Sequence, residues 1–116
     1  MTAEDNFAQR MRLGRLFDIY GGLLTDKQQQ CLRLYFYDDL SLSEIGDELG
    51  VSRQAVHDLL KRVEQTLERN EEKLRILERM ERERGMLRQA LALLRTRRQE
   101  DYKEATDLLR RMCSEE

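Results

Sequence analysis

The chain has 116 residues and a formal net charge of −2; 38% of its residues are charged, Pro is absent and Gly occurs six times. This composition favours an all-α protein whose charges lie on solvated helix faces, in one domain with a modest core. No apolar run approaches the ~20 residues of a membrane span and no signal-peptide pattern is present, so we expect a cytoplasmic protein.

The first predicted helix covers residues 4–20 and ends at the Gly pair 21–22. Its apolar face is broad, which indicates burial against more than one neighbour. The members of this face are Phe7, Met11, Leu13, Gly14, Leu16, Phe17 and Tyr20. Thr25 then caps a second helix over residues 25–37, in which we expect Cys31 to be a small core residue.

Residues 42–62 have the pattern of a helix-turn-helix, with an apolar stripe of Leu42, Ile45 and Leu49 on the first helix. Ser41 and Glu44 form a capping box, which satisfies backbone donors at the helix start. Gly46 lies inside this helix, where Gly costs ~1 kcal/mol relative to Ala, so it predicts a close crossing with the second helix. Gly50 ends the first helix because Gly takes the left-handed conformation without strain.

Ser52 is the expected cap of the second motif helix. We expect its buried side to contain Val56, Leu59 and Leu60, so that its other side faces out. In DNA-binding proteins of this class the exposed side enters the major groove. The candidate nucleic-acid contacts are Ser52, Arg53, Gln54, His57, Lys61 and Arg62.

The second motif helix is predicted to continue as a long rod, since no Pro or Gly follows until Gly85. A seam with a 3.5-residue period begins in it, as in coiled coils. After Val56, the members of this seam are Leu60, Val63, Leu67, Asn70, Leu74 and Leu77. Two interpretations stay open: a homodimer across the seam, and packing of the seam on the chain's own C-terminal helices.

Gly85 marks a break or a kink, and the sequence leaves open which, before two amphipathic C-terminal helices. The first of these ends near residues 95–98, and the second covers roughly residues 100–113. No linker-like segment occurs along the chain. We therefore expect residues 1–116 to form a single domain with three parts, an N-terminal helix (1–24), a helix-turn-helix unit (25–68) and C-terminal helices (69–113).

Charge is distributed unevenly along the chain. Residues 25–68 hold five basic and nine acidic side chains, whereas residues 82–111 hold nine basic and five acidic ones. Because phosphate neutralisation supplies most nucleic-acid affinity, the basic half is not the half that carries the motif. The candidate contacts for a partner protein or RNA are Arg88, Arg95, Arg97, Arg98, Arg110 and Arg111. Alternatively, these arginines are solvated and cover apolar helix faces with their stems.

The sequence contains no recognisable catalytic set: it has no Gly-rich phosphate loop, no GxSxG elbow and no HExxH. His57 is the only His and lies on a predicted exposed face, so we interpret it as a surface residue. Cys31 and Cys113 match no metal-ligand spacing, and reduced thiols are expected in the cytosol. We therefore expect a protein that is not an enzyme and that holds no metal or other cofactor.

A pattern across about residues 11–80 has three most specific pieces, LLTDKQ (23–28), LRLYFYDDLSLSEI (32–45) and VSRQAVHDLLKR (51–62). It strongly resembles the YlxM family of small bacterial helix-turn-helix proteins and, more distantly, the sigma-factor C-terminal region that reads promoter DNA. The resemblance implies a fold like sigma region 4, within the winged-helix-like superfamily of DNA-binding domains, with a long C-terminal helical extension. It makes Arg53 and Gln54 the expected groove-facing side chains.

The resemblance also implies a non-enzymatic regulatory protein of the signal recognition particle pathway, which binds the particle's GTPase or its RNA. The alternative is a DNA-binding transcriptional regulator, in which Arg and Gln would pair with guanine and adenine. Against that alternative stand Asp58, Glu64 and Glu68, which lie on the motif helix and would repel phosphate. A third, weaker interpretation is an oligomerisation module in which the motif is only a protein-contact surface.

Overall fold

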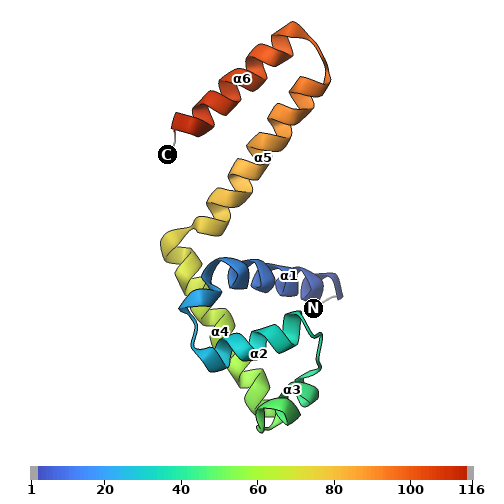
Figure 1. Cartoon of the computed structure of the whole chain (residues 1–116), viewed down its shortest axis with the longest axis vertical. Helices are drawn as coiled ribbons and strands as arrows, with labels where there is room; N and C mark the ends of the chain where they lie inside the picture. Colours follow the sequence, from blue (N-terminus) through green and yellow to red (C-terminus); the bar gives the residue numbers. More distant parts are fainter. Residues whose placement is uncertain (1–2, 115–116) are drawn as a thin grey trace. The chain divides into compact units, whose positions relative to one another are not determined.

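The computed structural model describes residues 3–114, which are helical almost throughout and contain no strand (Figure 1). The elements in chain order are α1 (Ala3–Tyr20), the 3-10 turn η1 (Gly21–Leu23), α2 (Asp26–Phe36), α3 (Leu42–Leu49), α4 (Arg53–Leu74), α5 (Ile76–Arg95) and α6 (Gln99–Ser114). The predicted all-α class is thereby confirmed. None of the described helices is long and apolar enough to cross a membrane.

The chain divides into two compact units, Met1–Arg75 and Ile76–Glu116. The single-domain organisation stays a prediction, and each unit is described by itself below. In the first unit, α1, α2 and α3 all pack against α4, as Figure 1 shows. The largest fully buried side chains of this unit are Leu16, Tyr20, Cys31, Leu32, Ile45, Val56, Val63 and Leu67. Cys31 is therefore a core residue as predicted, and its burial raises the pKa of its thiol.

Two capping boxes define the starts of α2 and α3. In α2, Thr25 accepts a hydrogen bond from the Gln28 backbone N–H, and the Gln28 side chain accepts one from the Thr25 backbone N–H. In α3, Ser41 and Glu44 make the same pair of bonds, at 3.1 and 3.0 Å. The hydrogen bonds from the Ser41 backbone and side chain hold the pKa of Glu44 below its usual range. The predicted cap of α3 is confirmed.

The turn of the motif has the predicted geometry. Gly50 follows α3 with φ 70° and ψ 32°, and its N–H donates to the Gly46 carbonyl. Ser52 caps α4, and its hydroxyl accepts a hydrogen bond from the Ala55 N–H at 3.1 Å. A Cβ built on Gly46 would lie 2.7 Å from the Val51 carbonyl oxygen, so α3 and the start of α4 approach as closely as predicted. The close contact is with the backbone, which cannot rotate away.

A break at Gly85 is wrong, because α5 runs through this position as a regular helix. The chain instead leaves the helical path at Arg75, which follows α4 in the left-handed region with φ 53°. The Arg75 N–H donates to the Glu71 carbonyl at 2.7 Å and closes the last turn of α4. The long rod predicted from Arg53 to Gly85 is therefore two helices.

The predicted seam is interrupted by this break, since α4 ends at Leu74 and Leu77 belongs to α5. Val63 and Leu67 are fully buried on α4, which packs against α1, α2 and α3 rather than presenting a free seam. Asn70 is half-buried, and Leu74 is 57% exposed. A homodimer remains a prediction, which the solution mass before and after Asn70→Leu would test.

The second unit is an antiparallel hairpin of α5 and α6 (Figure 1). Its small core consists of Ala90, Ala105 and Leu108, with Met86 and Leu93 packed against them. Arg97, in the connecting loop, has φ 59°. Asp101, in the first turn of α6, accepts hydrogen bonds from the Thr96 hydroxyl and from Arg98 Nε. These bonds, that from Thr96 first, hold the pKa of Asp101 below its usual range.

Candidate functional site

The outward side of α4 carries the predicted nucleic-acid contacts. Their side chains are all exposed, and they are Ser52, Arg53, Gln54, His57, Lys61 and Arg62. The Ser52 hydroxyl already accepts one hydrogen bond at the helix start, so its O–H and one remaining lone pair are available to a ligand. The local sequence thus positions an exposed face at the end of a rigid, capped turn, as a recognition helix requires.

Asp58 modifies this face. Gln54 Nε2 donates to Asp58 Oδ1 at 3.0 Å, and His57 Nδ1 lies 3.5 Å from the same oxygen. The amide that would read adenine is therefore engaged by a carboxylate on its own helix. A bidentate pair with adenine uses both groups of the amide, so the base would have to share the Gln54 NH2 group with Asp58 or displace Asp58.

Glu68 is less repulsive to phosphate than the sequence indicated. Arg12 of α1 forms a double contact with its carboxylate, with Nε to Oε1 at 2.6 Å and Nη2 to Oε2 at 3.0 Å. Such fork-shaped pairing neutralises the charge locally. The Arg12 partner could not be foreseen, because the two residues are far apart in sequence and meet only when α1 packs on α4.

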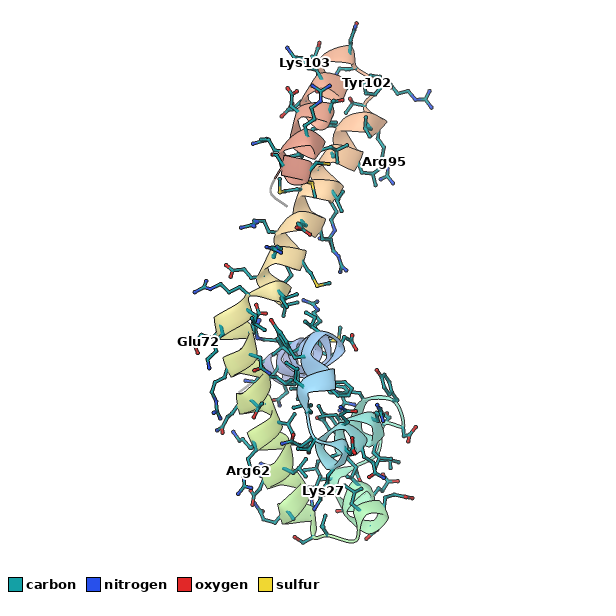
Figure 2. The ribbon with its side chains drawn as sticks, turned by 60° about the vertical axis from the view of Figure 1, so that its left-hand side comes forward. Lys27, Arg62, Glu72, Arg95, Tyr102 and Lys103 are labelled. Atoms are coloured by element: carbon teal, nitrogen blue, oxygen red, sulfur yellow. The ribbon has the colours of Figure 1, made fainter. Side chains whose placement is uncertain are left out.

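A depression of about 440 Å³ lies beside the recognition face, between the start of α2 and the first half of α4. It is lined by Thr25, Lys27, Gln28, Ala55, Asp58, Leu59 and Arg62. Figure 2 labels the two cations of this surface, Lys27 from α2 and Arg62 from α4. Sequence reasoning missed Lys27, although the packing of α2 beside the motif helix could have suggested it.

The six candidate partner contacts fall at three places in the second unit. Arg97 and Arg98 lie at the loop, where Arg98 is bonded to Asp101 at 3.0 Å. Arg88 and Arg95 are seven residues apart and share one side of α5, and Arg95 lies at the loop end of the hairpin in Figure 2.

Arg110 and Arg111 are consecutive on α6, so their side chains point about 100° apart. Arg110 lies two residues after the core residue Leu108, just as Arg95 lies two residues after the core-packed Leu93. Both arginines therefore point away from the helix partner, along the outer edges of the hairpin. Arg88, Arg95 and Arg110 lie on these edges, and Arg111 does not.

Among the described residues, no group of three or more His, Cys, Asp or Glu side chains is arranged to hold a metal ion. The arrangement can bind and orient a partner through charge and shape. The first unit contains a helix-turn-helix with a largely exposed second helix, and the second unit is a helical hairpin with basic edges.

A capped α3, a left-handed Gly turn and an outward-facing α4 define a helix-turn-helix protein. The family model described as "Putative helix-turn-helix protein, YlxM / p13 like" matches residues 7–108. The chain therefore belongs to this family, as the sequence resemblance predicted.

Three relatives illustrate the similarity, each bearing the name UPF0122 protein. One from Shouchella clausii is 52% identical over 77 residues, which is 66% of this chain and 71% of the relative. One from Halalkalibacterium halodurans is 49% identical over 79 residues, covering 68% and 72% of the two chains. One from Desulforamulus reducens is 47% identical over 83 residues, covering 72% and 71%.

Proposed function

We propose that the protein is a non-enzymatic regulator of the signal recognition particle pathway, which binds the particle's GTPase or its RNA through the α5–α6 hairpin. The observation that carries this proposal is the position of Arg88, Arg95 and Arg110 on the outer edges of the hairpin. All three are exposed, and none has an ion-pair partner among the described residues. Free cations of this kind are available to a carboxylate or a phosphate. The family resemblance supplies the pathway.

A binding titration tests the proposal, with the purified particle protein and the particle RNA as separate ligands of the full chain at low salt. Arg88→Ala with Arg95→Ala and Arg110→Ala should weaken binding at least tenfold, since three charge-assisted contacts are removed. The matched control is Arg53→Ala with Gln54→Ala, which removes exposed groups from α4 and should leave binding unchanged. Absence of binding to both ligands would discard the proposal.

A second candidate function is sequence-specific DNA binding through α4. It is supported by the exposure of Arg53, Lys61 and Arg62 and by the ion pair that neutralises Glu68. Asp58 and the acidic balance of residues 25–68 oppose it, because phosphate contacts dominate duplex affinity. For this function Arg53→Ala with Gln54→Ala should abolish a footprint on a defined operator, and the hairpin triple variant should preserve it.

A further inference from the structure

An apolar face of the α5–α6 hairpin is left uncovered. On α5, Leu87, Leu91 and Leu94 are 51%, 49% and 41% exposed, and on α6, Tyr102 and Leu109 are 41% and 36% exposed. The spacing on α5 is i, i+4 and i+7, which makes one stripe along the helix. The spacing on α6 is i and i+7, which does the same. Scattered exposed leucines are ordinary, but two aligned stripes are a surface.

The two stripes lie on the same side of the hairpin. Leu87, Leu91 and Leu94 each directly follow a residue that faces α6, and Leu109 directly follows one that faces α5. Each stripe is therefore turned by about 100° from the inter-helix contact. Because the helices are antiparallel, equal rotations along the chain bring both stripes to one face. Together Leu87, Leu91, Leu94, Tyr102 and Leu109 form what we call the hairpin face.

The apolar side chains of α5 and α6 also lie at matching heights along the two helix axes. Ala90 of α5 and Ala105 of α6 meet in the core, which fixes the register of the two helices. In that register Leu94 lies level with Tyr102 near the loop, where Figure 2 places Tyr102, and Leu87 lies level with Leu109. The hairpin face is therefore continuous across both helices over about two helical turns.

Basic side chains border the hairpin face on both sides. The next positions outward are Arg84, Arg88 and Arg95 on α5 and Lys103 and Arg110 on α6. All five are exposed. Three exposed acidic residues of α6 project toward the opposite side, and they are Glu100, Glu104 and Asp107. A partner that fits must be apolar along its middle and acidic along both edges.

We infer that the hairpin face docks an amphipathic helix of another protein, one whose apolar stripe is flanked by Asp or Glu. A third helix laid on the hairpin face would cover the five apolar side chains with i, i+3, i+4 and i+7 anchors. Its carboxylates would meet the bordering cations, so charge complementarity selects the partner. This inference rests on the proposed function, for which it names the chemistry of the partner.

Two other occupants fit less well. A second copy of the chain would place its own basic edges against those of the first, and like charges at a close contact are unfavourable. Nucleic acid phosphates would pair with the cations, but the leucines of the hairpin face would stay exposed to water. Proteins that bind single strands stack the bases on aromatic side chains, and Tyr102 is the one aromatic residue of the hairpin face.

The test uses the full chain and two designed helical peptides of about 20 residues, long enough to be helical alone. Both have the same Leu stripe, and one has Glu at the flanking positions where the other has Lys. We expect the Glu peptide to bind at least tenfold more tightly by isothermal titration, and Leu91→Lys to weaken it at least tenfold. Equal binding of the two peptides would overturn the inference.

Arg110 and Arg111 provide a matched pair for charge. Arg110→Glu should weaken binding of the Glu peptide about tenfold, whereas Arg111→Glu, one residue further on and off the hairpin face, should change it less than twofold. Equal effects would overturn the inference. Circular dichroism measures the helical content of each variant and checks that folding is retained. If a variant does not fold, the comparison of Glu-peptide and Lys-peptide binding to the unmodified chain still decides the question.

Cys113 supplies a second readout, since it lies one turn beyond Leu109 and is exposed while Cys31 is buried. The Glu peptide should slow the reaction of Cys113 with a thiol reagent at least fivefold, and the Lys peptide should not.

Two further results would overturn the inference. One is self-association of the chain that Leu91→Lys abolishes, and the other is flotation of the chain with phosphatidylserine vesicles that the same variant abolishes. Binding of the particle protein or RNA without peptide discrimination would leave the proposed function standing and remove only this inference.

Discussion

At the scale of single residues, the motif depends on two glycines that act differently. Gly50 provides a left-handed turn at φ 70° and has open space where a Cβ would lie. Gly46 has an ordinary helical conformation, but a Cβ there would meet the backbone of the turn, first at the Val51 carbonyl oxygen. The first role is conformational and the second is steric, so both helices can approach only with this pair in place.

Gly46→Ala should lower the free energy of unfolding by about 1–3 kcal/mol, because the new methyl group overlaps the Val51 carbonyl. The control is Gly14→Ala in α1, where the nearest atom to a new Cβ would be 3.6 Å away on Phe36. That substitution should be neutral or stabilising by up to about 1 kcal/mol, since Ala favours helix. Urea unfolding followed by circular dichroism measures both, and equal effects would contradict the steric account.

A second residue-scale feature is the buried hydrogen bond from the Tyr20 hydroxyl to Glu71 Oε1, at 2.7 Å. Tyr20 and Glu71 are 2% and 7% exposed, so a lost donor is not replaced by bulk water. Tyr20→Phe should therefore cost about 1–3 kcal/mol in unfolding free energy. Tyr37→Phe is the control, because Tyr37 is 67% exposed and should show no effect. A Tyr20→Phe chain as stable as the original would show that the bond contributes nothing net.

Structural features that depend on neighbouring residues could be predicted from the sequence, whereas contacts between residues far apart in the chain could not. The caps at Thr25, Ser41 and Ser52 use groups within a few residues of one another, so the pattern is visible in the chain. The Tyr20–Glu71 bond joins α1 to α4, and no local spacing indicates it.

At the scale of elements, the helix break was misplaced for a physical reason. Gly85 is exposed with no atom within 4 Å of a Cβ position, so it costs helix stability without creating a turn. Arg75 takes the left-handed conformation although neighbouring residues give no turn signal. The periodic seam was real in its spacing, but Val63 and Leu67 face the chain's own core. Periodicity identifies a buried stripe without identifying what buries it.

Asp101 gives the α5–α6 hairpin a pH dependence. Its pKa is lowered in the folded chain, mainly by the Thr96 hydroxyl, so its stabilising effect is complete above the unfolded pKa and is lost as pH falls through the folded one. Asp101→Asn should lower the hairpin's helical content at neutral pH and flatten its acid dependence. Circular dichroism between neutral and strongly acidic pH measures this. Asp107→Asn on the exposed side of α6 is the control, and a similar change there would contradict the assignment to Asp101.

At the scale of the whole molecule, the two units differ in how much they bury. The first has most of the buried apolar side chains, whereas the core of the hairpin consists of Ala90, Ala105 and Leu108. Chains near 40 residues rarely fold without additional support. We therefore expect the second unit to depend on the rest of the chain or on a partner for its order.

We expect a fragment of residues 76–116 to be largely unfolded when isolated, because its core is too small to offset the entropy of ordering two helices. A fragment of residues 1–75 should unfold cooperatively on heating. Circular dichroism melts of both fragments measure the difference. A cooperative transition in the shorter fragment would contradict the expectation.

The candidate site was predictable in part at this scale. The exposed side of α4 followed from the motif alone, since a capped turn fixes which residues face out. The position of Arg88, Arg95 and Arg110 on the outer edges could be recognised only once α5 was known to pack against α6, and the sequence pattern does not specify that packing. Arg111 was grouped with them because adjacency in sequence does not reveal a 100° turn about a helix.

The two capping boxes differ in whether the side chain at the third helical position can titrate, and this difference has a consequence in acid. The side chain that completes the capping box of α2 is the amide of Gln28, which does not titrate. In α3 it is the carboxylate of Glu44. Because the pKa of Glu44 is depressed by its bonds to Ser41, its support for α3 is lost as pH falls through that depressed value. Fraying on acidification should therefore begin at Ser41, ahead of Thr25, and amide exchange at the two helix starts would reveal that order. Glu44→Gln should equalise the two ends.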